Sequence, residues 1–376
     1  MKIEGGAEYQ LLGVRWYGEG AFHRETVTRE TSKAATVYKV APGQFIYNRL
    51  FAGKGAFGLV LPDFAGAFVS NEFPLFDTDT ERLSPGYLNL YFQQKQVWDH
   101  VESVSTGTTA SRNRWKESQF LAHHLPLPPL PIQARIVEVI RAVDDQITAL
   151  DVEADSLASV YLAATSLLWL TSEGNEAESR SLGDVMHLDI VRIPMEAGTT
   201  YHLAGVRNAG KGLVDKESFD GADTGYTAMN VLRENQVVMR KLTAWEGPIT
   251  VVPAEFDGFV ASNEFPTFTL VCDVAPSWMK HVCRTPRLWA EMQSRVVGTV
   301  QRRKRLNPDQ LLSVALPVPP RSEQEQAARA LEAVEGQVAV VRTEAARLRE
   351  VRARLLAGLL DHTIDIKFAE SEVSRG

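Results

Sequence analysis

Leu125-Pro-Leu-Pro-Pro129 decides the organisation of this chain, because it recurs as Leu316-Pro-Val-Pro-Pro320 and each copy opens a long segment of helical periodicity. Proline cannot continue a helix backwards, so each cluster marks a helix start. After the second cluster, Ser322 and Glu325 have the spacing of a capping box. The two clusters therefore predict long helices over residues 131–171 and 321–361.

Both segments carry apolar or small residues in the 4-3-4-3 spacing of a heptad seam. Every position of the first seam is matched 191 residues later, and only Arg352 breaks the apolar rule. A helix of about 38 residues, ~57 Å long, needs a partner along such a seam. We predict that the two helices pair antiparallel as a coiled coil, the alternative being that each packs on its own lobe. The residues expected to pair the helices are Ile136, Ile140, Val143, Ile147, Leu150, Leu157, Leu331, Val334, Val338, Val341 and Leu348.

The repeat extends upstream of the helices. Tyr9-Gln-Leu-Leu-Gly-Val-Arg15 matches Tyr201-His-Leu-Ala-Gly-Val-Arg207 at a shift of 192, and Ser70-Asn-Glu-Phe-Pro74 recurs unchanged as Ser262-Asn-Glu-Phe-Pro266. A period near 190 residues is too long for a solenoid, whose repeats run roughly 20–50 residues. The chain is therefore a tandem of two units, each a lobe followed by a long helix.

The lobes have the pattern of mixed structure. Short apolar runs bounded by Gly, Pro and Asn predict strands at Gln44–Tyr47, Gly58–Leu61, Gln236–Met239 and Ile249–Val252, whereas Pro85–Val101 and Pro276–Val297 look helical. The expected fold class is α+β, with two similar mixed α/β lobes separated by a pair of long antiparallel helices and related by a pseudo-twofold repeat. The expected boundaries are lobe 1 at 1–130, helix at 131–171, linker at 172–180, lobe 2 at 181–320, helix at 321–361 and tail at 362–376.

One segment has no repeat partner. Ser181–Ile190 leads into lobe 2, and nothing before Met1 corresponds to it. Either lobe 1 lacks an edge strand or the sequence starts late relative to this lobe.

The net charge of -7 counts at first against a nucleic-acid binder, but its distribution does not. Residues 1–130 and 181–320 are each neutral, and residues 131–180 carry 3 basic against 9 acidic side chains. No apolar run or leader suggests a membrane protein, so we expect a cytoplasmic one.

Cys272 and Cys283 lack metal-ligand neighbours, so buried free thiols are expected, with no metal and no cofactor.

The Leu-Pro-x-Pro-Pro cluster follows Gly-Thr and a basic stretch and precedes a long helix, and the whole arrangement is given twice. It resembles the specificity subunit of Type I restriction-modification systems over nearly the whole chain, most specifically at Gly298–Gln324. Glu323-Gln324 follows the second cluster, whereas Ile132-Gln133 follows the first, so the Glu of the family pattern is absent there.

The resemblance implies a non-catalytic protein whose two target-recognition domains each read half of a bipartite double-stranded DNA target. It also implies that the helices set the spacing and dock methyltransferase subunits, two of them, with restriction or translocase subunits joining the assembly.

Basic residues at loops are the candidate DNA contacts, since guanidinium groups bind phosphate and guanine edges. Two groups precede the proline clusters, two arginines follow Gly-Val, and the rest leave strands. The candidates are Arg112, Arg114, Lys116, Arg302, Arg303, Lys304 and Arg305; Arg15 and Arg207; and Arg49, Lys54, Arg240 and Lys241. The alternatives are solvated loop charges or pairing with the acidic first helix for the basic runs, and turn stabilisation for Arg15 and Arg207. Asn71 and Asn263 could read adenine, but their unchanged setting in both lobes favours a structural role.

The alternatives to a DNA-recognition subunit are an enzyme and a structural adaptor. An enzyme is disfavoured, because the chain lacks Asn/Asp-Pro-Pro-Tyr/Phe, a Gly-rich cofactor loop and a phosphate-binding Gly-Lys-Ser/Thr, and its histidines are scattered apart from His123-His124 in an expected strand. A coiled-coil structural adaptor predicts no salt-dependent affinity for DNA. Within DNA recognition, the specificity subunit of a Type IIB-like or other methylation-based phage-defence system is the alternative.

Overall fold

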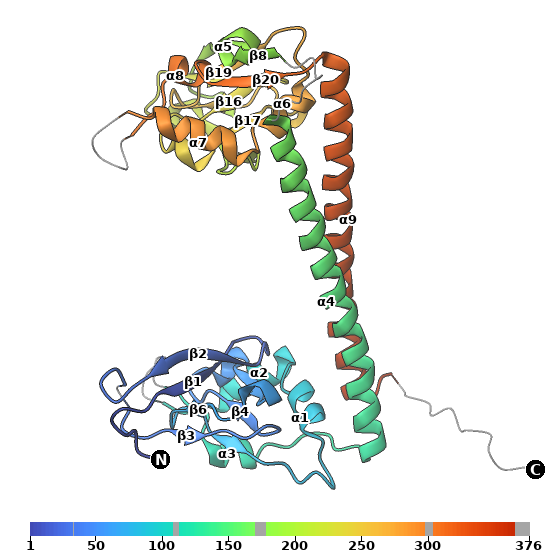
Figure 1. Ribbon diagram of the computed structural model, residues 1–376. Helices are drawn as coiled ribbons and strands as arrows, with labels where there is room; N and C mark the ends of the chain where they lie inside the picture. The colour runs from blue at the N-terminus through green and yellow to red at the C-terminus, as the bar shows by residue number, and fades with distance from the viewer. Residues whose placement is uncertain (33, 108–112, 170–177, 298–303, 365–376) are drawn as a thin grey trace, which may run out of the picture. The chain divides into compact units, whose positions relative to one another are not determined.

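The computed structural model describes residues 1–364 apart from residue 33 and residues 108–112, 170–177 and 298–303. The chain forms two compact units, Met1–Leu150 with Thr343–Gly376 and Asp151–Arg342. Each unit contains one lobe and part of both long helices. Figure 1 labels the elements.

In its described residues, lobe 1 contains two small sheets and three short α-helices. One sheet has the order β2-β1-β6-β3 and the other the order β5-β4-β7. Aromatic side chains fill the core between the second sheet and the helices, with Phe45, Tyr47, Phe57 and Trp115 all buried. The elements are β1 (Tyr9–Val14), β2 (Ala21–Val27), β3 (Tyr38–Lys39), β4 (Phe45–Tyr47), β5 (Phe57–Leu59), β6 (Phe68–Val69), β7 (Leu75–Phe76), α1 (Pro85–Tyr91), α2 (Lys95–Val104) and α3 (Glu117–Leu121).

Lobe 2 repeats this order of elements, which confirms two similar mixed lobes. Its main sheet has the order β17-β16-β19-β9 and packs against Trp278, which is fully buried. The repeated elements are β12 (Ala204–Val206), β13 (Leu213–Asp215), β16 (Val237–Met239), β17 (Ile249–Val251), β18 (Val260–Ala261), β19 (Thr267–Leu270), α6 (Pro276–Val282), α7 (Pro286–Arg295) and α8 (Pro308–Leu312). The lobe also contains β11 (Thr200–Tyr201), which pairs with β14 (Phe219–Asp220), and β10 (Val191–Pro194), which pairs with β15 (Ala228–Val231).

Each stretch expected as one helix before the proline cluster is two helices. The first helix ends at α1 in lobe 1 and at α6 in lobe 2. At each end a tryptophan indole binds a free carbonyl: Trp98 Nε1 donates to the Phe92 carbonyl at 2.6 Å, and Trp289 Nε1 donates to the Cys283 carbonyl at 2.9 Å. In lobe 2, Thr285 caps the second helix and Pro286 occupies its first turn, where a proline starts rather than continues a helix.

The segment before lobe 2 forms elements that lobe 1 lacks within its described residues. β8 (Glu178–Ser181) pairs with β20 (Ala315–Val318), α5 (Leu182–Val185) follows, and β9 (Met186–Leu188) pairs with β19. The matching sheet of lobe 1 has three strands and ends at β7. The strand expected at His123-His124 is wrong, since the described part of lobe 1 offers that stretch no partner strand.

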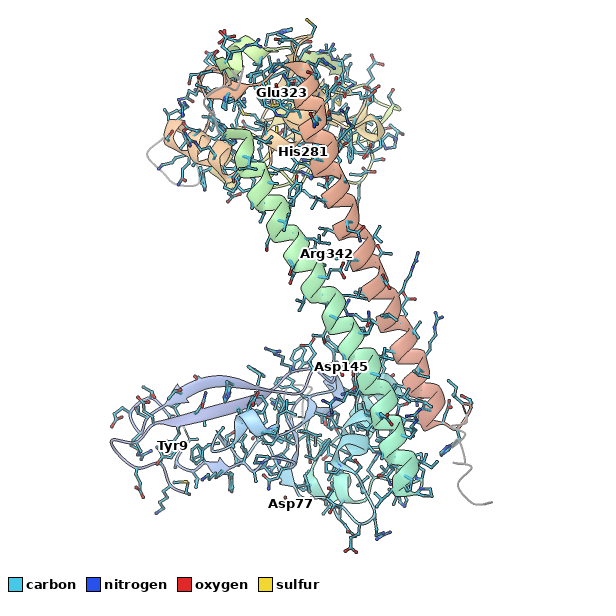
Figure 2. The ribbon with its side chains drawn as sticks, turned by 45° about the vertical axis from the view of Figure 1, so that its right-hand side comes forward. Tyr9, Asp77, Asp145, His281, Glu323 and Arg342 are labelled. Carbon is cyan, nitrogen blue, oxygen red and sulfur yellow. The ribbon has the colours of Figure 1, made fainter. Side chains whose placement is uncertain are left out.

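The two long helices are α4 (Leu130–Ser166) and α9 (Arg321–Leu360), and they pair antiparallel within each unit. In the first unit, Ile136 and Ile140 near the start of α4 share a buried cluster with Leu356 and Leu360 near the end of α9. In the second unit, Arg342 of α9, labelled in Figure 2, pairs with Asp155 of α4 at 3.6 Å. The residues expected to pair the helices are all buried or half-buried, so the alternative of two separately packed helices is wrong.

Cysteine exposure corrects one expectation. Cys283, at the end of α6, is buried, but Cys272 is exposed because it lies in the turn between β19 and α6. Across the described residues, no group of three or more His, Cys, Asp and Glu side chains could hold a metal ion. No helix in the described ranges is both long enough and apolar enough to cross a bilayer.

Candidate nucleic-acid interface

The same hairpin loop leaves the first strand of each lobe's repeat. Arg15 follows β1 and its amide donates to the Gly20 carbonyl at 2.9 Å; Arg207 follows β12 and its amide donates to Gly212 at 2.9 Å. Gly20 and Gly212 have φ of 81° and 82°, a region that favours glycine. The repeated glycines therefore give the two loops one backbone conformation.

Each hairpin loop rests on a second loop, which joins β4 to β5 in lobe 1 and β16 to β17 in lobe 2. Gly18 N donates to Gly55 O, and Gly210 N to Gly247 O, both at 2.8 Å. Gly55 packs so closely on Trp98 that a Cβ atom would lie 2.5 Å from the indole, and at Gly247 the distance to the Trp289 ring would be 2.6 Å. This glycine–tryptophan contact fixes both loops on the helices of the lobe.

Arg15 and Arg207 project from this fixed base. Both side chains are exposed, and neither makes an ion pair with a carboxylate of a described residue. The Arg15 guanidinium lies 4.9 Å from the centre of the Phe22 ring, which orients it without neutralising its charge. Each lobe thus presents one uncompensated guanidinium at the same place.

The neighbours of these arginines differ between the lobes. Lys54 of lobe 1 is exposed, and its carbonyl accepts from the Tyr17 amide of the hairpin loop at 2.8 Å. Its counterpart, Glu246, is held by Arg240 at 3.3 Å and by Asn208 at 2.8 Å. The loops share a scaffold and an arginine, but their surrounding charge is different.

Arg114 and Arg305 recur because each pairs with the glutamate of the repeated Ser-Asn-Glu-Phe-Pro motif. Arg114 binds both carboxylate oxygens of Glu72 at 3.1 Å, and Arg305 binds Glu264 at 3.1 Å. The hydrogen bonds that Arg114 donates to Glu72 raise the pKa of Arg114. Sequence reasoning missed this contact, although both partners recur at nearly the same shift. Both arginine side chains are still partly open to solvent, so they could also contact DNA. That role stays a prediction.

Two other basic candidates, Arg49 and Arg240, bind groups of their own lobes. Arg49 pairs with Glu117, and Arg240 donates to the Leu242 carbonyl, Thr243, Asn208 and Glu246. Lys241 and Lys304 are half-buried and Lys116 is exposed. Arg112, Arg302 and Arg303 lie outside the described residues.

The asparagines of the repeated motif are exposed in both lobes. Neither the Asn71 amide nor the Asn263 amide hydrogen-bonds a described residue, whereas the motif's serine hydroxyls each accept the glutamate amide at 3.4 Å. The serine and the glutamate, rather than the asparagine, make the motif's internal contacts.

A buried glutamine joins each lobe to its long helix. Gln324 accepts from the Ala275 amide at 2.8 Å and donates to the Asp273 and Pro319 carbonyls at 3.1 and 2.8 Å. Gln133 repeats the arrangement, accepting from the Ser84 amide and donating to the Arg82 and Pro128 carbonyls, each at 2.8 Å. The sequence did contain a sign of this contact: the glutamine is the same in both repeats, at a shift of 191, although the residue before it is Ile132 in one and Glu323 in the other.

A polar layer crosses the helix pair in each unit, and it explains the exception at Arg352. In the first unit Arg352 of α9 pairs with Asp144 of α4 and donates to Gln93 at 2.8 Å. In the second unit Arg284 pairs with Glu335 of α9 and bonds Tyr161 of α4, whose hydroxyl lies 2.8 Å from His281 Nδ1. Burial lowers the pKa of His281, labelled in Figure 2, to about 4.

No protein-family model and no curated protein sequence matches the chain. Solved structures do match it. The HsdS subunit from Thermoanaerobacter tengcongensis is 16% identical with a TM-score of 0.50, and the match covers 95% of this chain and 91% of that one. A chain from a structure describing complex assembly and conformational transition of the type I R-M system is 13% identical with a TM-score of 0.59, covering 94% and 91%. The chain therefore shares the fold of the HsdS subunits of type I restriction-modification systems.

Proposed function

We propose that this chain is the non-catalytic DNA-specificity subunit of a type I restriction-modification complex, each lobe reading one half of a bipartite target. The fold supports this, because it pairs two similar lobes with two long helices. The observation that carries the proposal is the exposed, unpaired guanidinium that both lobes present on one fixed loop.

Arg15 and Arg207 are suited to phosphate. A guanidinium binds phosphate oxygens through parallel hydrogen bonds, and contacts of this kind position a protein on DNA without reading sequence. A residue that is the same in both lobes cannot distinguish two different half-sites. We therefore assign the two arginines to the DNA backbone.

Base reading then belongs to the positions of the same loops that differ between the lobes. Trp16 of lobe 1 corresponds to Asn208, and Lys54 corresponds to Glu246. Strand-end loops on a rigid scaffold are where specificity residues are usually displayed. These differences support two half-sites of different sequence.

The long helices are the proposed docking surface for methyltransferase subunits. Their seam residues are taken up by helix pairing, so a partner must use other positions. Val152 and Val160 of α4 and Val340 of α9 are 61%, 55% and 59% exposed. Exposed apolar side chains of this kind are typical of protein–protein contacts. Restriction or translocase subunits would join the same assembly.

The test of DNA binding is charge reversal at the two shared arginines. Arg15→Glu and Arg207→Glu, compared with Arg329→Glu on the exposed face of α9, are titrated with duplex DNA by fluorescence anisotropy at several salt concentrations. We expect each lobe variant to lose about tenfold in affinity and to reduce the salt slope by about one. A structural adaptor predicts no salt-dependent affinity for DNA in the parent chain or in any of the three variants.

The test of specificity is methylation mapping after co-expression with the adjacent methyltransferase. A two-part methylated motif is expected, and Arg207→Glu should impair methylation of that motif. Charge reversal across Arg302 to Arg305 should change one half-site, and an untouched pattern would remove that run from the interface. A translocase gene beside the methyltransferase gene separates a type I complex from a Type IIB-like one.

A further inference from the structure

The polar layers of the two units take their arginine from different places. In the first unit, the guanidinium that binds Asp144 of α4 belongs to Arg352, near the end of α9. In the second unit, the guanidinium that binds Glu335 of α9 belongs to Arg284 of lobe 2. The second helix therefore supplies the arginine in one unit, and the lobe supplies it in the other.

The repeat relates the positions of the two layers. Each unit has one position on the lobe, one on the helix that follows that lobe, and one near the end of the other long helix. At the shift of 191, the pairs are Gln93 with Arg284 on the lobes, Asp144 with Glu335 on the following helices, and Arg352 with Tyr161 on the other helices. An acid stands on the following helix in both units, whereas the arginine and its neutral neighbour change places.

In the first unit, one arginine satisfies the other two positions. Arg352 Nη2 donates to Gln93 Oε1 and to Asp144 Oδ2, both at 2.8 Å. The Arg352 side chain is 20% exposed, so water screens its charge only in part. The lobe must therefore present a neutral acceptor here, because a second cation at position 93 would face the guanidinium.

In the second unit, the same space already contains two cations. Arg284 is 21% exposed and donates to the Tyr161 hydroxyl at 3.3 Å, and Lys280 lies 3.5 Å from Glu335. An arginine in place of the tyrosine would put three cations around one carboxylate. The end of the other helix must therefore present a neutral group here, and the tyrosine hydroxyl also lies 2.8 Å from His281 Nδ1.

The lobe position of each layer also contacts the hairpin loop of that lobe. Arg284 Nε donates to the Gly210 carbonyl at 3.2 Å. In lobe 1, a Cβ atom on Gly18 would lie 3.0 Å from Gln93 Cγ. The residue that faces the second helix therefore also supports the loop that carries Arg15 or Arg207.

We propose that the two polar layers determine which helix end each lobe accepts: lobe 1 accepts the arginine end of α9, and lobe 2 the tyrosine end of α4. The buried glutamine is the same in both units and cannot make this choice. A polar residue in a helix seam can select the partner helix at some cost in stability. The inference concerns recognition within the chain and does not depend on what the lobes bind.

The same layers disfavour pairing of like helices from two copies of the chain. If α4 paired with α4, Tyr161 of one copy would meet Asp144 of the other, and the carboxylate would lose its guanidinium. If α9 paired with α9, Arg352 of one copy would meet Arg284 of the other beside a single Glu335. Only the pairing of α4 with α9 matches the charges of both layers.

Exchanging residues between the layers tests the proposal in the full chain without changing its composition. Tyr161→Arg with Arg352→Tyr gives each unit the contact that pairing of like helices would create. Gln93→Arg with Arg284→Gln exchanges the lobe residues instead and also mismatches both layers. The four substitutions together match both layers again, now in exchanged units.

Thermal unfolding provides the readout. We expect each double variant to melt about 3–6 °C below the parent chain, the shift that corresponds to a roughly tenfold larger unfolding constant. The quadruple variant should recover at least half of the summed losses. A double variant that does not fold, beside a quadruple variant that does, also supports the proposal. Double variants that melt like the parent, or a quadruple variant no more stable than the weaker double variant, overturn it.

Discussion

Replacing Gln324 with Met should loosen the attachment of α9 to lobe 2. The Gln324 side chain is 1% exposed and makes three hydrogen bonds, to one amide and two carbonyls. Met has nearly the same volume, so little of the effect comes from a cavity. The variant leaves the Ala275 amide without its acceptor in a buried place, and an unpaired buried donor costs about 1–3 kcal/mol. With two carbonyls also losing a donor, we expect a loss of about 2–3 kcal/mol.

Thermal unfolding measures this loss. Roughly 2–4 °C is expected per kcal/mol for a domain of 150–250 residues, so the melting temperature should fall by about 4–12 °C. Gln326→Met, at an exposed position of the same helix, is the control and should unfold like the parent chain. Gln133→Met should reproduce the loss in the first unit. If Gln324→Met and Gln326→Met unfold alike, the three hydrogen bonds do not hold the helix to the lobe.

Three further predictions concern reactivity, pH and the helix pair. A maleimide should label exposed Cys272 rapidly and Cys283 only after unfolding, since burial removes access to Cys283 and raises its pKa to about 12; labelling of both in the native chain would contradict this. His281, whose pKa falls to about 4, binds fewer protons when folded than when unfolded, so stability should decline by up to about 3 kcal/mol as pH falls from 6.5 to 4. Denaturant titrations should show that His281→Gln removes this part of the decline, and an identical pH profile would exclude the histidine. Val143→Lys should lower the melting temperature and weaken the complex with methyltransferase, whereas Ala149→Lys on the exposed face should not; equal effects would argue against the seam.

The sequence was sufficient for the repeat, because a duplicated unit leaves matched residues at a constant shift. The proline clusters lie directly before α4, which begins at Leu130, and α9, which begins at Arg321, because proline cannot continue a helix backwards. It could not explain Arg352, because the partner Asp144 lies 208 positions away and no local pattern joins them.

Two further features could not be judged from the sequence, for the same reason. A strand exists only with a partner, so the apolar stretch around His123 could not be judged from its own residues. The recurrence of Arg114 and Arg305 was interpreted as a shared role in DNA contact, which stays a prediction; the pairing of these arginines with Glu72 and Glu264 was not foreseen. A charged residue that is the same in both repeats can form an ion pair within its own lobe as readily as it can bind a partner.

The buried glutamines have a consequence for how such chains can change. The hydrogen bonds of the Gln133 and Gln324 side chains go to main-chain groups and not to other side chains. Every residue supplies a main-chain carbonyl, and every residue but proline a main-chain N–H, so these hydrogen bonds do not depend on which side chains the lobe carries. A lobe of different surface sequence could therefore be grafted onto either helix by recombination without redesigning the joint, which would make new binding preferences available through exchange of whole segments.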